Sequence, residues 1–192
     1  MEFERICSER NAGRAVLEVG AVPDDTSLLA MKSLKDAKKK IGINIDGPYT
    51  YKDFDIVQGN ANSMNCFEDG QFDTVLCNSV FEHDKFFWKT LSEMKRIVKP
   101  GGLLVIGAVG YTTLPIEKYI QFFISKLSFL SRHFDKLLLH NSTLTFRIHN
   151  FPGDYYRFSP QAFKEVLFEG MHDVLISTLM VPPRIIGSGI KT

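Results

Sequence analysis

The chain of 192 residues carries little net charge and few cysteines. Its formal charge is +1, so no long-range field draws it toward nucleic acid or an anionic membrane. The three cysteines, Cys7, Cys66 and Cys77, are widely spaced and show no metal-ligand pattern. We therefore expect a reduced, cytoplasmic protein without a bound metal, and these scarcities argue against a disulfide-rich secreted domain.

Long apolar runs and targeting signals are also missing. No run reaches the roughly 20 residues that a helix needs to cross a bilayer. The first residues lack the basic-then-apolar order of a signal peptide, and no repeat or low-complexity segment is present. A chain of this length can bury a sizeable core, so we expect a single domain over residues 1–192.

Short apolar segments alternate with helical patterns along most of the chain. Such alternation predicts an α/β fold with a mostly parallel, Rossmann-like sheet and helices on both faces. The expected strands are residues 15–19, 41–45, 54–57, 73–77, 103–109, 173–181 and 185–191, and the expected helices are residues 26–34, 85–98 and 161–169.

The stretch of residues 114–140 departs from this alternation, because many apolar and aromatic side chains are interspersed there with lysine and arginine. We expect one or two helices inserted after the fifth strand, covering the sheet and bordering a substrate pocket. A lid, a contact in a homodimer and an interfacial membrane helix remain alternatives, since mixed apolar and basic faces suit all three.

Polar or glycine residues follow the first four expected strands. The carboxyl ends of parallel strands form the edge at which open α/β sheets bind ligands, so we expect these residues to share one site. The candidate ligand-binding residues at this edge are Glu18, Gly20, Asp46, Asn60, Ala61 and Asn78.

Three of these residues suit a nucleoside. Gly20 lets the backbone approach a ligand closely, because it has no Cβ. The carboxylate of Asp46 can accept both hydroxyl hydrogens of a ribose, and the amide of Asn60 can pair with the edge of an adenine. Structural alternatives are that Asp46 is a turn residue before Gly47-Pro48 and that Asn60 occupies a left-handed turn.

The loop after the first strand helps to choose between nucleotide cofactors. It contains one glycine, Gly20, and two carboxylates, Asp24 and Asp25, which would repel the pyrophosphate of NAD. S-adenosylmethionine has no phosphate and carries an ammonium and a sulfonium. The loop therefore favours S-adenosylmethionine, and an NAD-dependent enzyme remains a weaker alternative.

Several motifs together resemble the class I S-adenosylmethionine-dependent methyltransferases, in particular their small type-11-like domain. The resemblance implies a seven-stranded sheet whose last strand is antiparallel, S-adenosylmethionine as cofactor, and a small-molecule or glycan-type acceptor. Val22 and Asp24 stand where the family usually has glycines, so a catalytically silent nucleoside-binding protein remains an alternative. The motifs are Val16-Leu17-Glu18-Val19-Gly20, Asp46, Gly59-Asn60-Ala61, residues 72–83, Lys99-Pro100-Gly101-Gly102 and residues 149–160.

An oxygen or nitrogen acceptor would also need a base. His83 is the first candidate, because it lies just past the fourth strand and histidine suits proton transfer at neutral pH. His149 and Asp154 are second candidates, if their segment folds back over the same edge. The structural alternatives are that His83 caps the following helix and that Asp154 pairs with Arg157.

Overall fold

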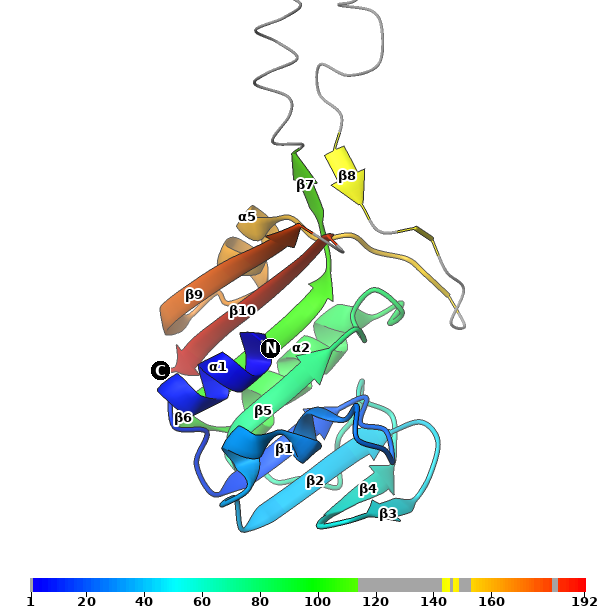
Figure 1. The fold of residues 1–192 in the computed structure, drawn as a ribbon, viewed down its shortest axis with the longest axis vertical. Coiled ribbons are helices and arrows are strands. Elements are labelled where there is room, and N and C mark those ends of the chain that lie inside the picture. Colours follow the sequence, from blue (N-terminus) through cyan, green and yellow to red (C-terminus); the bar gives the residue numbers. More distant parts are fainter. Residues whose placement is uncertain (1, 114–142, 146, 149–152, 181–182) are drawn as a thin grey trace, which may run out of the picture.

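The structure is a computed structural model that describes residues 2–113, 143–145, 147–148, 153–180 and 183–192 (Figure 1). At its centre is an eight-stranded sheet with the strand order β3-β4-β2-β1-β5-β6-β10-β9. The strands are β1 (Ala15–Val19), β2 (Lys39–Asn44), β3 (Tyr49–Tyr51), β4 (Phe54–Gln58), β5 (Phe72–Asn78), β6 (Val98–Val109), β9 (Met171–Met180) and β10 (Pro183–Lys191).

The sheet is mixed, with a parallel centre. β1 pairs in parallel with β2 and β5, while β4 and β6 extend the parallel set on either side. β10 is antiparallel to both β6 and β9, which confirms the expected antiparallel last strand. The three-residue edge strand β3, antiparallel to β4, was not predicted and makes the sheet one strand wider than expected. A separate two-stranded ribbon pairs β7 (Tyr111–Thr113) with β8 (Thr143–Thr145).

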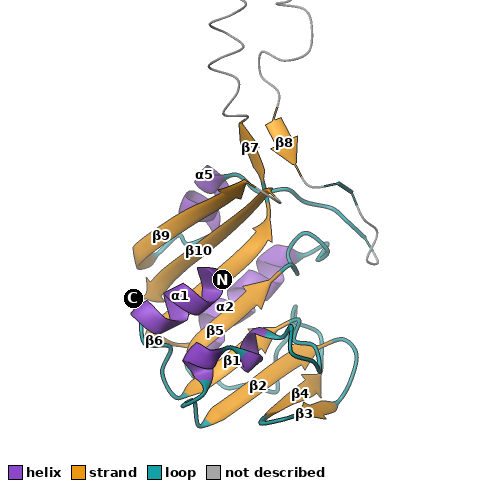
Figure 2. Cartoon of the chain, viewed as in Figure 1, coloured by secondary structure: helices purple, strands orange, loops and turns teal. Residues whose placement is uncertain are grey.

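Helical segments cover both faces of the sheet (Figure 2). One face packs against α1 and the short turns η1 and η2, and the other against α2 and the α5–η3 segment, so each face has its own buried apolar cluster. The bounds are α1 (Glu2–Glu9), η1 (Leu28–Ala30), η2 (Lys32–Leu34), α2 (Phe87–Ile97), α5 (Pro160–Ala162) and η3 (Phe163–Leu167).

The predicted helix over residues 26–34 was wrong. The segment forms two 3₁₀ turns separated by Met31, whose backbone is extended. Leu28, Met31 and Leu34 recur every three residues and are all buried, which is the spacing of a 3₁₀ helix rather than of an α-helix. The sequence therefore predicted the apolar residues of this segment correctly but the type of helix wrongly.

Two other helices agree better with the sequence. The pattern over residues 85–98 corresponds to α2. The helix predicted over residues 161–169 begins as α5, where Ser159 is the N-cap and its Oγ accepts a hydrogen bond from Ala162 N at 3.0 Å. That helix continues as the π-helical turn η3 and ends earlier than expected. The amphipathic α1 was not predicted. The proposed insertion at residues 114–140 lies outside the described residues, so its structure and its contacts stay predictions.

Candidate functional site

The ends of four neighbouring strands meet at one edge of the sheet. β4, β2, β1 and β5 are adjacent and parallel, so Gly20, Asp46, Asn60 and Ser79, which follow them, lie along that carboxyl edge (Figure 1). The chain first adds strands on one side of β1 and then on the other, beginning with β5. The gap between β1 and β5 is therefore the topological switch point, where sheets of this kind hold ligands.

Gly20 sits where the loop after β5 approaches the end of β1. Its φ is +79°, and a Cβ added there would lie 2.4 Å from Val80 Cγ2. The amide of Gly20 donates to the carbonyl of Ile43 at 2.8 Å, which fixes this backbone on β2. Only glycine fits this position without displacing Val80, whose side chain occupies the space beside it.

Glu18 organises the loop that follows β1. Its carboxylate is 5% exposed and accepts hydrogen bonds from Ser27 Oγ at 2.5 Å and from Leu29 N at 3.3 Å. Burial raises the pKa of the Glu18 carboxyl above its ordinary value, while these hydrogen bonds oppose the shift. The observed contacts of Glu18 are thus with its own loop.

The two loop carboxylates that stand out in the sequence also have local partners. Asp24 accepts hydrogen bonds from the amide and the hydroxyl of Thr26, which lower the pKa of its carboxyl. Asp25 forms an ion pair with Lys52. Both carboxylates of the loop after β1 are therefore engaged by side chains of this chain.

Asp46 and Asn60 are both exposed at the carboxyl edge. The amide of Asp46 donates to Asn44 Oδ1 at 3.3 Å, and Asn60 Oδ1 accepts from Asn62 N at 2.9 Å. Among the described residues, Asn60 does not have the left-handed backbone that the structural alternative required. Its neighbour Ala61 is half-buried against the core.

Asn78, at the end of β5, is bound by a residue that the sequence did not indicate. Arg184 on β10 donates from Nη1 to Asn78 Oδ1 at 2.9 Å and from Nη2 to Ser79 Oγ at 2.7 Å. The guanidinium thereby joins two strand ends separated by more than a hundred residues in the chain. Because the pairing depends on the register of β10, local sequence patterns carry no sign of it.

His83 contacts the segment that begins at Gly153. Its Nδ1 forms a hydrogen bond with the carbonyl of Gly153, so Nδ1 carries the proton and Nε2 carries the lone pair of the neutral ring. Tyr155 N also donates to the carbonyl of Glu82 at 2.7 Å. Residues 153–158 therefore fold back over the carboxyl edge, which was the condition for a role of this segment; His149 lies outside the described residues.

The structural alternatives for His83 and Asp154 have different outcomes. α2 has no side-chain cap at its N-terminus, so His83 does not cap it; the nearby Asp84 accepts from Phe86 N at 2.8 Å and from Thr90 Oγ1 at 2.6 Å. Asp154 does pair with Arg157, with a second contact of 2.7 Å, and its side chain is fully buried. This pairing raises the pKa of the Arg157 guanidinium.

Glu82 was not predicted as a site residue, although it lies in the same polar stretch as His83. Its side chain is 1% exposed, and neither carboxylate oxygen has a hydrogen-bond partner among the described residues. Burial raises the pKa of the Glu82 carboxyl above its ordinary value. A carboxylate directly before His83, in the polar stretch that follows β5, is the sequence signal for a role of Glu82.

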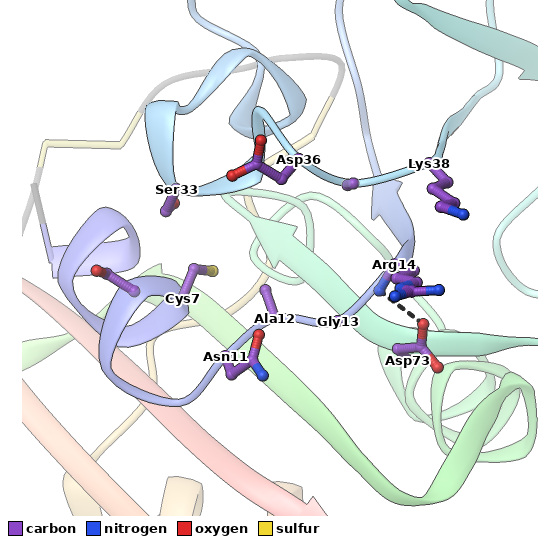
Figure 3. Close-up of a pocket in the computed structure, with 11 residues that line it drawn as sticks. Cys7, Asn11, Ala12, Gly13, Arg14, Ser33, Asp36, Lys38 and Asp73 are labelled. Carbon is purple, nitrogen blue, oxygen red and sulfur yellow. Dashed lines mark hydrogen bonds between the residues drawn. The ribbon is translucent and has the colours of Figure 1, made fainter.

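A hollow at the opposite edge of the sheet is distinct from this site (Figure 3). It lies at the amino ends of β1, β2 and β5, where Asp73 accepts hydrogen bonds from Arg14 N and Ala15 N, both at 2.8 Å, and from Lys99 Nζ. Within the described parts of the chain, no group of three metal-ligating side chains occurs, and no helix is both long and apolar enough to cross a membrane.

Residues 22–106 match a family profile described as a methyltransferase domain. The chain is 32% identical over 103 residues to a demethylmenaquinone methyltransferase of Lactococcus lactis subsp. lactis, covering 53% of this chain and 40% of the relative. It is 28% identical over 124 residues to a demethylmenaquinone methyltransferase of Staphylococcus epidermidis, covering 63% and 48%. The chain thus spans less than half the length of these curated relatives.

Two solved structures share the fold. A SAM-dependent methyltransferase from Archaeoglobus fulgidus superposes with a TM-score of 0.61 at 16% identity, covering 99% of this chain and 93% of that one. A phosphoethanolamine N-methyltransferase 2 of Haemonchus contortus, solved with S-adenosyl-L-methionine, has a TM-score of 0.61 at 12% identity, covering 99% of this chain and 52% of that one. At such low identity the likeness shows the fold alone.

Proposed function

We propose that this chain, whose residues 22–106 match a methyltransferase domain, is an S-adenosylmethionine-dependent methyltransferase that methylates a small-molecule or glycan-type acceptor on oxygen or nitrogen. The observation that carries the proposal is the carboxyl edge at the switch point between β1 and β5, where the parallel strands bring Gly20, Asp46 and Asn60 to the same edge. The curated relatives named for demethylmenaquinone support an acceptor of small-molecule size. In this proposal, residues 1–192 form a single methyltransferase domain.

The residues at this edge fit S-adenosylmethionine, which supplies a methyl group on a positively charged sulfur. Gly20 provides backbone that a nucleoside can approach, and the exposed Asp46 carboxylate is placed after β2 to accept the ribose hydroxyls. Asn60 and Ala61 follow β4 beside it and are assigned to the adenine. Glu18 and Asn78, at the ends of β1 and β5, are assigned an indirect role in cofactor binding. Glu18 bonds to Ser27 and Asn78 bonds to Arg184, and these contacts position the loops around the site.

Exchange of Asp46 for alanine is expected to weaken binding of S-adenosylmethionine by roughly 10- to 100-fold, because two hydrogen bonds to a charged acceptor are lost. Isothermal titration calorimetry measures the change. Asp36→Ala is the matched control: it removes an equally exposed carboxylate, but at the amino edge of the sheet. Equal affinities of the Asp46 variant and the wild type would remove Asp46 from the site.

His83 is assigned as the base that receives the acceptor's proton. Its Nδ1 is committed to the Gly153 carbonyl, which fixes the tautomer and leaves Nε2 as the basic atom. Asp154 is a weaker candidate, because its carboxylate already bonds to Arg157. His149 stays a prediction.

His83→Gln is expected to bind S-adenosylmethionine normally and to turn over about 10²- to 10⁴-fold more slowly, the range typical for loss of a general base. Glutamine retains a side-chain donor for the Gly153 carbonyl but offers no basic nitrogen. Calorimetry gives the affinity, and release of S-adenosylhomocysteine gives the rate. Wild-type turnover in this variant would exclude His83 as the base.

A catalytically silent nucleoside-binding protein is the second candidate, favoured by Val22 and Asp24 in the loop after β1. Titration with S-adenosylmethionine, S-adenosylhomocysteine and NAD separates the candidates. We expect binding of both sulfur nucleotides. Binding without turnover on any acceptor would favour the silent protein, and well-folded protein that binds neither would refute the methyltransferase.

A further inference from the structure

Glu82 is a buried carboxylate without a structural partner in the described part of the chain. The side chain is 1% exposed, and both Oε1 and Oε2 lack a hydrogen-bond partner there. Burial of an unpaired polar group costs free energy, so proteins rarely retain one without a purpose. The residue lies next to His83, on the loop that leads away from the carboxyl end of β5.

Glu18 shows what a structural carboxylate looks like at the same edge. It is similarly buried, on the strand paired with β5, but it accepts hydrogen bonds from Ser27 Oγ and Leu29 N. Removal of Glu18 would leave the buried Ser27 hydroxyl without its acceptor, whereas Leu29 N would keep its bond to Ser27 Oγ. Removal of the Glu82 carboxylate would break no hydrogen bond to the side chain of another described residue.

The structural needs of the Glu82 loop are met by other groups. Asp84 accepts hydrogen bonds from Phe86 N and from the side chains of Asn62 and Thr90. The backbone of Glu82 is held separately, since its carbonyl accepts from Tyr155 N at 2.7 Å. The side chain of Glu82 is thus not required to hold the loop in place.

The nearby cations make their hydrogen bonds to other groups. Arg184 bonds to Asn78 and Ser79, and Arg157 bonds to Asp154. Their positive charges and the backbone N–H of Glu82 favour its ionised form, but burial outweighs them and raises the pKa of the carboxyl. A buried carboxylate with a raised pKa is a stronger base than an exposed one.

We propose that Glu82 binds the methyl acceptor, with its carboxylate accepting the hydrogen of the acceptor's own amine or hydroxyl group. This inference rests on the proposed function and deepens it, because it restricts the acceptor to nucleophiles that carry an N–H or O–H bond. Glu82 and His83 then have complementary roles, since Glu82 orients the acceptor's hydrogen and His83 offers a second basic atom on the same loop.

The proton transfer balances within this arrangement. As the N–H or O–H bond of the acceptor breaks, its proton bonds to an oxygen of Glu82 and the electron pair stays on nitrogen or oxygen. That pair forms the new bond to the methyl carbon, while the pair of the old carbon–sulfur bond remains on sulfur and cancels its charge. The neutral carboxylic acid of Glu82 then passes this proton to His83, the base that finally receives it, and His83 releases it to solvent after the product leaves.

The first test uses the protein without any ligand. Glu82→Gln keeps the shape of the side chain and removes the ionisable group. Because the pKa of Glu82 is raised in the folded protein, folding disfavours ionisation of this carboxyl group. The stability of the wild type that depends on Glu82 is therefore fully present below the ordinary glutamate pKa of 4.5 and is lost as the pH rises through the folded pKa. We expect Glu82→Gln to unfold about 2–4 °C above the wild type at pH 8, an advantage that disappears near pH 4.

Glu18→Gln is the contrasting variant in that experiment. Because its carboxylate is bonded to Ser27 and Leu29, we expect its unfolding midpoint to fall below that of the wild type at pH 8. If Glu82→Gln also unfolds below the wild type at pH 8, Glu82 has a structural role and the proposal is overturned.

The second test measures turnover with S-adenosylmethionine on three acceptor classes: primary amines, sugar and phenol hydroxyls, and carbon nucleophiles. We expect turnover with amines or hydroxyls, and a fall of about 10²- to 10⁴-fold in kcat for Glu82→Gln with unchanged affinity for S-adenosylmethionine. Turnover restricted to carbon nucleophiles, or equal rates for variant and wild type, overturns the proposal.

The same design separates this proposal from the proposed function. Failure of the wild type to bind S-adenosylmethionine in calorimetry refutes the methyltransferase itself, whereas normal binding with a Glu82-independent rate refutes only the role of Glu82. If no acceptor in the three classes turns over, the unfolding comparison at pH 8 decides: a higher midpoint for Glu82→Gln supports a ligand-directed carboxylate, and a lower one refutes it.

Discussion

Gly20→Ala is expected to destabilise the fold by roughly 2–5 kcal/mol and to lower the affinity for S-adenosylmethionine at least about tenfold. The backbone of Gly20 has a φ of +79°, which costs an alanine about 1–2 kcal/mol. The added Cβ would also lie 2.4 Å from Val80 Cγ2, and overpacking of this kind typically costs about 1–3 kcal/mol. Relief of the contact moves the loop after β5, and with it the edge where the cofactor is assigned.

Urea denaturation measures the first effect and calorimetry the second. The control is Val80→Ala in the Gly20→Ala background, which removes the Cγ2 atom that the new Cβ would meet. We expect the double variant to regain the overpacking part of the lost stability and to keep the backbone part. A double variant as unstable as Gly20→Ala would show that contact with Val80 is not the reason for glycine at this position.

The sheet and its ligand edge could be predicted because their causes are local. Buried strands such as β1 and β5 are short apolar runs, and each ends where polar residues or glycine begin. Given parallel pairing, the ends of neighbouring strands must meet, so Gly20, Asp46 and Asn60 were placed on one edge without any knowledge of side-chain contacts. The edge strand β3 was missed because three residues are too few to show a pattern.

The helical layer was less predictable. A three-residue apolar spacing in residues 28–34 satisfies an α-helix in a sequence pattern as well as a 3₁₀ turn, so the pattern alone does not distinguish the two. The α1 helix, in contrast, had a readable signal: Phe3, Ile6 and Cys7 recur at helical spacing and are all buried.

The chemistry of the site depended on contacts between distant parts of the chain. The bonds of Arg184 to Asn78 and Ser79 follow from the register of β10 on β6, which local patterns do not encode. The sequence likewise could not show that Asp84 bonds to Asn62 and Thr90 while Glu82, two residues earlier, has no hydrogen-bond partner among the residues that the structure describes. Burial and hydrogen bonding, rather than residue type, distinguish the two carboxylates.

Asp154→Ala is expected to destabilise the protein by about 3–5 kcal/mol, the range for removing one partner of a buried ion pair. The Asp154 side chain is fully buried and that of Arg157 is 16% exposed, with a contact of 2.7 Å between Asp154 Oδ2 and Arg157 Nη2. Without the carboxylate, the guanidinium loses its contacts with Asp154, and the space that the carboxylate fills is left in a buried position. Because residues 153–158 bond to the backbone of Glu82 and to His83, local loss of this segment also disturbs the loop after β5.

The double variant Asp154→Ala/Arg157→Met separates the ion pair from catalysis. It removes both charges and replaces the guanidinium with an apolar side chain, so we expect it to be more stable than Asp154→Ala alone. Urea unfolding of the wild type, both single variants and the double variant completes the cycle. If Asp154 holds the segment in place, activity should recover together with stability in the double variant. A stable double variant that binds S-adenosylmethionine normally but remains inactive would instead show that Asp154 takes part in the chemical step.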